Sequence, residues 1–470
     1  MFVQQLYTNC LSEAAYYIES NGEAAVIDPL RDVEEYINLA NERGATIKYI
    51  FETHFHADFV SGHLDLGKKT NAPIVYGPNT ITQFPVHVAK DGEQFKVGEL
   101  TIEVLHTPGH TLESSCYLLK DENGRDYAVF TGDTLFVGDV GRPDLAQGGD
   151  ITTEDLAGML YDSLQKKIIS LADNVIVYPA HGPGSACGKN LGPDTYSTIG
   201  DEKQTNYALK AHNKEEFIKA VTDGLATPPQ YFSVNARINK EGYNSLDEVL
   251  NKGMKALSVE EFKIAMKKDD TIVLDTRKSS VFTEGFVPSA ISIGLDGRYA
   301  EWAGSLLPFN KPFLLVTDEG KEEESIIRLA RVGFDKMEGY LKGGFDAWKK
   351  AGEKIDMIIN VEADELAMDI PHDDNLLVID VRKEVEFADG HVKNALNLPL
   401  NEMTDPAMMA NFEETQNLYV HCAGGYRSII ACSLLKRQGI HNIRNIVGGW
   451  NKIKEQEGKI KTEKETSVLN

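Results

Sequence analysis

The sequence has few cysteines and a deficit of basic residues. Its 470 residues include five cysteines, an odd number, at widely scattered positions: Cys10, Cys116, Cys187, Cys422 and Cys432. This scatter argues against a disulfide framework and favours free thiols in a reducing cytoplasm. The 48 lysines and arginines face 72 aspartates and glutamates, which gives a formal net charge of −24. That charge disfavours nucleic acids and anionic membranes as partners.

Long apolar runs are also missing. The sequence contains no uninterrupted apolar stretch of about 18 residues, the length that a membrane-spanning helix needs. The N-terminal segment Met1–Tyr7 lacks a basic stretch followed by an apolar one, so no secretory signal is predicted and a cytoplasmic location is expected. Hydrophobic residues nevertheless make up 42% of the chain, enough for real cores. The length predicts about three domains.

Histidines and aspartates gather in four short segments near the N-terminus. The segments are Thr53–Phe59 (THFHADF), His106–Thr111 (HTPGHT), Thr131–Asp133 (TGD) and Pro179–Gly182 (PAHG). Imidazole and carboxylate groups on loops are ligands that zinc and non-haem iron prefer. In their order and spacing these segments resemble the metallo-β-lactamase superfamily, whose metal ligands lie on loops at the ends of sheet strands.

Residues 1–240 have a pattern that fits the αββα sandwich of that superfamily. Short β-rich runs such as Ala24–Asp28 and Leu100–Val104 end in polar residues, and Asp32–Arg43 has helical periodicity. We therefore expect an α/β fold here, with the metal motifs on its loops.

The residue after Asp58 narrows the chemistry. Two-metal members of the superfamily carry a histidine at this position, whereas this chain carries Phe59, whose side chain cannot bind a metal. With one metal, the resemblance sharpens towards the persulfide dioxygenases, in which two histidines and one aspartate hold Fe(II). A set of this kind leaves three adjacent coordination positions open, here for substrate sulfur and O₂.

Carried onto this chain, the resemblance implies one Fe(II) per chain, with Zn as the alternative. The implied ligands are His54, His110 and Asp133. The remaining members of the two-metal set would orient these ligands by hydrogen bonds. Those remaining members are His56, Asp58 and His181.

The rest of the chain repeats itself with a shift of 105 residues, as seen when Ile272–Arg277 is matched to Leu377–Arg382. Two copies of one domain are therefore expected, over residues 255–353 and 358–462. Each copy alternates apolar strands with helical runs, which predicts a parallel α/β sheet. The shared pattern resembles the rhodanese domain.

The second copy contains a loop suited to a reactive sulfur. A strand ends at Cys422, a glycine-rich loop follows, and a helix is expected to begin near Ser428. Backbone N–H groups of such a loop can point at the sulfur, and the helix N-terminus and Arg427 add positive charge. Cys422 is therefore predicted to be a nucleophile that carries a persulfide. The predicted cradle consists of Ala423, Gly424, Gly425, Tyr426 and Ser428.

The first copy lacks this chemistry. The shift places Thr317 opposite Cys422 and Glu322 opposite Arg427, and the first copy contains no cysteine. Its acidic loop would also repel an anionic sulfur donor. We expect residues 255–353 to be a catalytically inactive spacer or docking domain.

Two further residues have open alternatives. Arg142 could hold a substrate carboxylate or phosphate, or it could tie its loop down through a salt bridge to a neighbouring acid. Cys187 follows the His181 loop and could lie near the metal pocket, or it could be a small packing residue.

The two resemblances share one substrate class. They imply that the first domain oxidises a low-molecular-weight persulfide with O₂ to sulfite and thiol, and that Cys422 moves sulfur between thiosulfate, sulfite and thiols. The direction of this transfer and the thiol that carries the persulfide stay open. Superfamily resemblance favours a homodimer or homotetramer.

Two other functions compete with this hypothesis. A glyoxalase II-like thioesterase would use zinc-bound hydroxide on a glutathione thioester, and Phe59 is the residue against it. A non-catalytic sulfur carrier or sensor would use the metal structurally. The open ligand set disfavours this, because structural zinc sites are usually closed four-coordinate shells.

Overall fold

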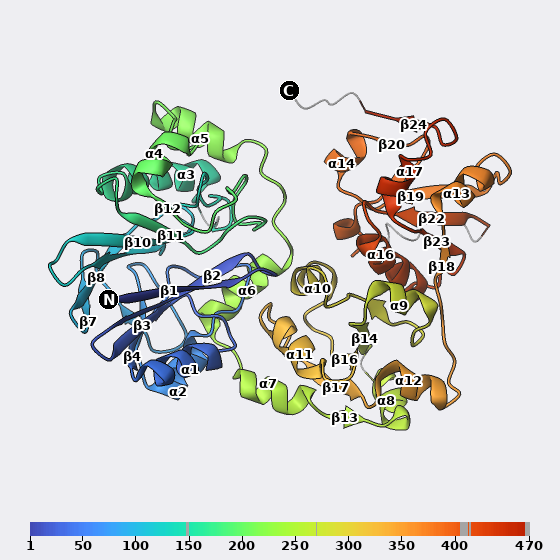
Figure 1. The fold of residues 1–470 in the computed structure, drawn as a ribbon, viewed down its shortest axis with the longest axis horizontal. Helices are drawn as coiled ribbons and strands as arrows, with labels where there is room; N and C mark the ends of the chain where they lie inside the picture. Colours follow the sequence, from blue (N-terminus) through green and yellow to red (C-terminus); the bar gives the residue numbers. More distant parts are fainter. Residues whose placement is uncertain (147–149, 269, 405–411, 413–414, 466–470) are drawn as a thin grey trace. The chain divides into compact units, whose positions relative to one another are not determined.

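The computed structural model contains two compact units (Figure 1). The first comprises Met1–Glu248 together with Leu329–Asp335, and the second comprises Val249–Arg328 together with Lys336–Asn470. The structure describes residues 1–146, 150–268, 270–404, 412 and 415–465. No helix within those ranges is both long enough and apolar enough to cross a membrane.

The first unit is built on two six-stranded sheets, ordered β1-β2-β3-β4-β5-β6 and β12-β11-β10-β9-β8-β7. The first sheet consists of β1 (Phe2–Thr8), β2 (Glu13–Ser20), β3 (Glu23–Ile27), β4 (Thr46–Phe51), β5 (Ile74–Tyr76) and β6 (His87–Val88). The second consists of β7 (Gln94–Val97), β8 (Leu100–His106), β9 (Ser115–Lys120), β10 (Asp126–Gly132), β11 (Ile176–Pro179) and β12 (Ser197–Thr198).

Helices cover the outer faces of both sheets. Buried Tyr16, Phe51 and Phe130 belong to the core between the sheets. Separate clusters pack the first sheet against α1 and α2, and the second sheet against α3 and α5. The helices of this unit are α1 (Glu34–Arg43), α2 (His63–Thr70), α3 (Thr153–Ser163), η1 (Leu164–Ile168), α4 (Ile199–Thr205), α5 (Lys214–Thr222), α6 (Tyr231–Glu241) and α7 (Leu246–Gly253, which ends in the second unit). The predicted αββα sandwich is confirmed.

Local signals set the ends of several elements. α1 ends where Gly44 adopts a left-handed conformation with φ of 67°, which glycine reaches without steric cost. α3 begins with a capping box between Thr152 and Asp155. The four histidine and aspartate motifs lie at the ends of β4, β8, β10 and β11, in the loops that follow these strands.

A short segment from far along the chain completes the first unit. The guanidinium of Arg31, fully buried, pairs with both carboxylate oxygens of Asp335 at 2.5 and 2.8 Å. It also donates to the carbonyls of Ala330 and Asn244 at 2.9 and 2.6 Å. A buried cation needs such partners, because an isolated charge away from water is strongly destabilising.

The second unit contains two parallel five-stranded sheets, ordered β13-β17-β16-β14-β15 and β18-β23-β22-β19-β21. The first has β13 (Ala256–Leu257), β14 (Ile272–Asp275), β15 (Ile291–Ser292), β16 (Phe313–Val316) and β17 (Met337–Leu341). The second has β18 (Ile359–Val361), β19 (Leu376–Asp380), β21 (Leu396–Asn397), β22 (Asn417–His421) and β23 (Ile443–Ile446). The identical order confirms a repeat with a parallel α/β fold.

Helices alternate with these strands, and a two-stranded ribbon lies near the C-terminus. The first copy contains α8 (Val259–Met266), α9 (Ser279–Glu284), α10 (Tyr299–Leu306), α11 (Glu322–Ala330) and α12 (Gly344–Lys350). The second contains α13 (Ala363–Asp369), α14 (Glu384–Ala388), η2 (Leu400–Glu402), α16 (Tyr426–Arg437) and α17 (Gly449–Ile453). The ribbon pairs β20 (His391–Val392) with β24 (Thr462–Glu463).

Both copies contain the same buried clamp. Arg277 pairs with Asp275 and donates to the carbonyl of Gly285, and its guanidinium lies 4.4 Å from the ring centroid of Phe345. In the second copy Arg382 pairs with Asp380, donates to the carbonyl of Gly390 and lies 4.7 Å from the ring of Trp450. The motifs that revealed the repeat are therefore packing residues, and the first copy keeps them although it has no cysteine.

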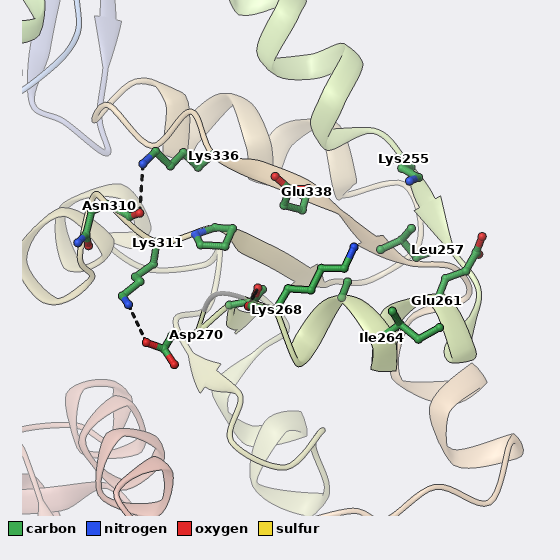
Figure 2. A pocket seen from close by; sticks show the side chains of 13 residues that line it. Lys255, Leu257, Glu261, Ile264, Lys268, Asp270, Asn310, Lys311, Lys336 and Glu338 are labelled. Atoms are coloured by element: carbon green, nitrogen blue, oxygen red, sulfur yellow. Dashed lines mark hydrogen bonds and ion pairs between the residues drawn. The ribbon is translucent and has the colours of Figure 1, made fainter.

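A cavity of about 870 Å³ lies in the first copy (Figure 2). Lysines and acids mix along its walls: Lys311 pairs with Asp270 at 2.8 Å, and Lys336 donates to the carbonyl of Asn310 at 3.1 Å. None of its lining residues is one of the predicted site residues. Its mixed charge does not single out a ligand.

Candidate metal centre and candidate sulfur-transfer site

The structure brings three of the predicted metal ligands together at the end of the sandwich. His54 follows β4, His110 lies in the loop after β8, and Asp133 follows β10. Asp133 Oδ2 lies 3.8 Å from His54 Nε2 and 3.5 Å from His110 Nε2. All three side chains are buried, and these ligand atoms form one group that could hold a metal ion.

Hydrogen bonds behind the two histidines set their tautomers. The Thr53 hydroxyl donates to Asp28 Oδ2 at 2.8 Å, so it accepts at 2.9 Å from Nδ1–H of His54. His110 Nδ1 lies 2.8 Å from the carbonyl of Arg142, which can only accept, so this nitrogen carries the proton. Each Nε2 is then left with a lone pair directed at Asp133. Metal-bound histidines are usually held in this way.

The arrangement fits a bound cation. His54 Nε2 and Asp133 Oδ2 are buried and have no hydrogen-bond partner among the residues that the structure describes. Two lone pairs and a carboxylate oxygen facing one another repel in the absence of a positive charge. Two nitrogens and one oxygen suit Fe(II) or Zn(II).

His181 lies between two carboxylates. Its Nδ1 is 2.8 Å from Asp133 Oδ1, and its Nε2 is 2.7 Å from Asp58 Oδ2. Burial opposes protonation of the ring, but the charges of Asp133 and Asp58 outweigh it and raise the pKa of His181 well above its usual value. The ring thus orients the second oxygen of Asp133, and the role of His181 and Asp58 in supporting a bound metal stays a prediction.

His56 belongs to a different group of side chains, although its ring centroid lies 4.2 Å from that of His54. Its Nε2 lies 3.1 Å from Asp28 Oδ1 and 3.7 Å from Glu52 Oε2, and these three residues form a separate buried group. Burial, reinforced by the charge of Asp28, raises the pKa of Glu52 well above its usual range. His56 therefore contacts His54 ring to ring and also shares Asp28 with Thr53, and its supporting role stays a prediction.

Phe59 occupies the position where two-metal relatives carry a histidine. Its ring is fully buried, and its centroid lies 4.3 Å from that of His56. The side chain packs as part of the interior and offers no ligand atom near Asp58 and His181.

Cys187 lies beside the centre, as one of its two alternatives predicted. Its sulfur forms a group with Asp58 and His181 in which all ligand atoms lie within 4.8 Å of one another. Burial, with the negative charges of Asp58 and Asp133, raises the pKa of the Cys187 thiol well above its usual value. The thiol is thus held in its protonated form.

Arg142 has the salt bridge to a neighbouring acid that one of its two alternatives describes, and substrate binding by this residue stays a prediction. Its guanidinium is buried and pairs with both oxygens of Asp144 at 2.6 and 2.7 Å. The same group donates to the carbonyls of Ala186 and Ala226 at 3.3 and 2.6 Å. These bonds tie three loops together, and the carbonyl of Arg142 itself orients His110.

The sulfur-transfer loop has the predicted strand, loop and helix order. Cys422 follows β22 and is buried, and the Gly425 N–H donates to its sulfur at 3.1 Å. Ser428 lies 3.7 Å from the sulfur and is fixed by a 2.7 Å bond from its hydroxyl to Asn445 Oδ1. α16 begins at Tyr426, two residues earlier than expected. Ala423 and Gly424 complete the turn between the strand and Gly425.

Arg427 has a partner that the sequence analysis missed. Its two terminal nitrogens pair with both oxygens of Glu386 at 2.6 and 2.8 Å. Part of the positive charge expected at Cys422 is therefore balanced by Glu386. The same analysis missed Asp28, whose only sequence signal is an acid at the end of a predicted strand.

The first copy offers no equivalent nucleophile. Thr317 follows β16 as Cys422 follows β22, and each carbonyl lies against a glycine, Gly344 or Gly449, at the start of a helix. α11 then begins with Glu322, Glu323 and Glu324. The first copy therefore keeps the strand, loop and helix arrangement, but it has threonine in place of the cysteine.

The sequence matches known families over most of its length. Residues 8–181 match the Metallo-beta-lactamase superfamily, and residues 258–351 and 362–456 each match the Rhodanese-like domain. The chain is 31% identical over 220 residues to "Persulfide dioxygenase ETHE1, mitochondrial" of Mus musculus, covering 46% of this chain and 78% of that protein. The chain belongs to the metallo-beta-lactamase superfamily. Two rhodanese-like domains follow its metallo-beta-lactamase domain.

The chain is also similar to a curated hydrolase and to a solved structure of the superfamily. A probable hydroxyacylglutathione hydrolase of Schizosaccharomyces pombe is 32% identical over 167 residues, covering 35% of this chain. The chain spans 60% of the length of that hydrolase. The crystal structure of a metallo-beta-lactamase from Staphylococcus aureus has a TM-score of 0.64 and 32% identity, covering 73% of this chain and 98% of that one.

Proposed function

We propose that this protein is an Fe(II)-dependent persulfide dioxygenase that also transfers sulfur at Cys422. The first unit would oxidise a low-molecular-weight thiol persulfide with O₂ to sulfite and thiol. The second unit would exchange sulfane sulfur among thiosulfate, sulfite and thiols. Together these reactions would remove sulfide and persulfide in a reducing compartment such as the cytoplasm, where the free thiols on which Cys422 depends persist.

The observation that carries the proposal is a three-ligand centre together with a phenylalanine, Phe59, after Asp58. His54, His110 and Asp133 converge with unpartnered atoms. Phe59, the residue after Asp58, offers no ligand atom, and the His181 ring lies between two carboxylates, although Asp58, His181 and Cys187 still form a buried group that could hold a metal ion. A mononuclear open site suits O₂ chemistry on iron better than hydrolysis at a two-metal site.

Iron bound there would supply the redox chemistry that moves both atoms of O₂ to the terminal sulfur. One persulfide, one O₂ and one water give one thiol and one sulfite. The residues of the chain would position the reactants: Thr53 and the carbonyl of Arg142 fix the two histidine rings, and His181 fixes the carboxylate. Their burial keeps bulk water from the reacting sulfur.

The C-terminal loop supports the second reaction. A persulfide on Cys422 would place its terminal sulfur among the backbone N–H groups of residues 423–428, at the start of α16. Attack by sulfite on that terminal sulfur forms the S–S bond of thiosulfate and returns the Cys422 thiolate. The reverse reaction would load Cys422 from thiosulfate.

Similarity to the hydroxyacylglutathione hydrolase favours a second candidate, a glyoxalase II-like zinc thioesterase. Metal analysis of protein purified without oxygen separates the two candidates. About one iron per chain, with O₂ uptake and sulfite release on addition of glutathione persulfide, is the result expected for the dioxygenase. Zinc alone, with hydrolysis of a glutathione thioester and no O₂ uptake, would establish the thioesterase instead.

The assembly state is part of the proposal. A homodimer or homotetramer is expected from the superfamily resemblance, and light scattering on the purified chain measures it. If the measured mass at micromolar concentration is that of a single chain, the expected homo-oligomer is wrong, and the proposed reactions are not affected.

A further inference from the structure

The first rhodanese-like copy lacks a nucleophile, yet it touches the loop that holds Cys422. The hydroxyl of Tyr426 donates to the carbonyl of Gly294 in the first copy at 2.9 Å. Tyr426 is the residue after Gly425, whose N–H lies 3.1 Å from the Cys422 sulfur. Two consecutive residues therefore contact the reactive sulfur and the inactive copy.

The tyrosine ring fills the space over a glycine of the first copy. A Cβ atom added at Gly297 would lie 2.6 Å from Cε2 and 2.7 Å from the hydroxyl oxygen of Tyr426. Real Cβ atoms do not approach other atoms this closely. Glycine at 297 is thus needed for the tyrosine to lie where it does.

The receiving loop is held firmly in place. Arg328 donates to the carbonyl of Leu295 at 2.7 Å and to the carbonyl of Gly297 at 3.2 Å. Its guanidinium also lies 5.4 Å from the ring centroid of buried Tyr299. The carbonyl of Gly294 is therefore a fixed acceptor.

The helix that follows the catalytic loop is fixed to the same copy. The Ser292 N–H donates to the Ser433 hydroxyl at 3.1 Å, and Arg437 donates to the carbonyl of Ser289 at 3.0 Å. Both Ser433 and Arg437 lie on α16, whose first residue is Tyr426. The loop and its helix thus share one support.

The Cys422 loop needs outside support, because its own sequence restricts its backbone very little. Gly424 and Gly425 are adjacent, and Gly425 has a φ of 110°, a conformation that other residues rarely adopt. Two glycines in a row give a backbone that can move its N–H groups away from the sulfur. An anchor directly after them restricts that motion.

We infer that the first rhodanese-like copy is a positioning element for sulfur transfer, which acts on the Cys422 loop through Tyr426. Tyr426 is a positioning residue, and Gly294 and Gly297 form its receptor. The inference rests on the proposed sulfur transfer at Cys422, and it gives the inactive copy a function beyond that of a spacer.

A double-mutant cycle in the full-length chain tests it. Gly297→Ala, Tyr426→Ala and the double variant are compared with Tyr426→Phe, which keeps the ring and loses only the hydrogen bond. Tyr340→Phe, a half-buried tyrosine on β17 of the same copy, is the matched control. The readouts are kcat and KM for thiosulfate:cyanide transfer, and the pH profile of Cys422 alkylation by iodoacetamide, read by peptide mass spectrometry.

We expect Gly297→Ala and Tyr426→Ala each to lower kcat by about 10- to 100-fold, because small displacements of a reacting group have effects of this size. The kcat of Tyr426→Phe should lie between the kcat values of these two variants and that of the unaltered protein. The double variant should match Tyr426→Ala alone, since both changes break one contact. The alkylation profile should move to higher pH in the same order, and Tyr340→Phe should change nothing.

Losses that multiply in the double variant, or an unchanged kcat in Gly297→Ala, would overturn the inference. Alkylation reports on the loop even if the unaltered protein transfers no sulfur. An unchanged alkylation profile in all variants would then refute the positioning role, whereas missing transfer activity alone would refute only the proposed function. Urea unfolding followed by tryptophan fluorescence checks that each variant is folded, because Trp302, Trp348 and Trp450 lie in the second unit.

Discussion

His181 Nδ1 lies 2.8 Å from Asp133 Oδ1, so the histidine that the superfamily resemblance assigns to a second metal here orients a carboxylate predicted to bind the first. The other ring nitrogen lies against Asp58, at 2.7 Å. A ring fixed at both nitrogens cannot also offer a lone pair to an ion without giving up one of these carboxylates. This relationship makes the centre sensitive to changes on either side of His181.

The first prediction separates the metal ligands from their support. Asp133→Ala should abolish iron retention and O₂ uptake, because it removes a ligand and leaves His181 without its partner. His56→Ala should cost about 10–100-fold in metal affinity or activity, as is typical for groups that support ligands. Metal analysis of both variants beside His54→Ala provides the measurement. Loss of iron from His56→Ala as complete as that from His54→Ala would show that His56 is itself a ligand.

The second prediction restores the missing histidine. Phe59→His completes the seven-residue set of the superfamily, since Asp58 and His181 are already adjacent. When produced in cells grown with zinc, this variant should bind close to two metals per chain and gain weak thioesterase activity through a bridging hydroxide. The unaltered protein should stop near one metal under the same conditions. Two metals in the unaltered protein would contradict the mononuclear centre.

The third prediction concerns the independence of the two reactions. Cys422→Ser should eliminate thiosulfate:cyanide transfer, because Thr317 stands at the matching position of the first copy. O₂ uptake with supplied glutathione persulfide should persist. Residual transfer in this variant would point to Cys187, and Cys187→Ser on the same background would decide the matter.

The fourth prediction concerns the clamp that both copies share. Arg277→Ala should destabilise the second unit by about 3–5 kcal/mol, because it leaves Asp275 buried without its cation. Burial already raises the pKa of Asp275, although Arg277 opposes this. Urea unfolding followed by tryptophan fluorescence measures the loss, with the exposed pair Lys311 and Asp270, broken by Lys311→Ala, as the control. Equal effects of the two substitutions would show that burial of the clamp has no energetic consequence.

Much of the fold could be predicted from the sequence, and the three residues predicted as metal ligands lie together in the structure. The metal ligands lie in short motifs with fixed spacing, and the repeat has an unbroken shift. What escaped prediction depends on contacts between residues far apart in the chain. Asp28 fixes Thr53 from 25 residues away, and Glu386 pairs with Arg427 from 41 residues away.

Local patterns carry no information on such pairs. Arg142 illustrates this limit, because a buried arginine beside an acid and an arginine waiting for a substrate read identically in sequence. Only the distance to Asp144 and the burial of the guanidinium separate them. The orientation of His56 is a similar case, since a histidine two residues after a metal ligand can face either side of the loop.

The pairing of Arg31 with Asp335 affects when the first unit can complete its folding during synthesis. The first unit takes most of its residues from the N-terminal half of the chain, but its last seven, Leu329–Asp335, leave the ribosome only after most of the first rhodanese-like copy. At roughly 5–20 residues per second, that delay is on the order of ten seconds. During it, Arg31 has neither its carboxylate nor the carbonyl of Ala330. Arg31 therefore lacks its ion-pair partner until Asp335 has been made, and in a fragment ending at residue 248 it would keep only the carbonyl of Asn244 among these partners.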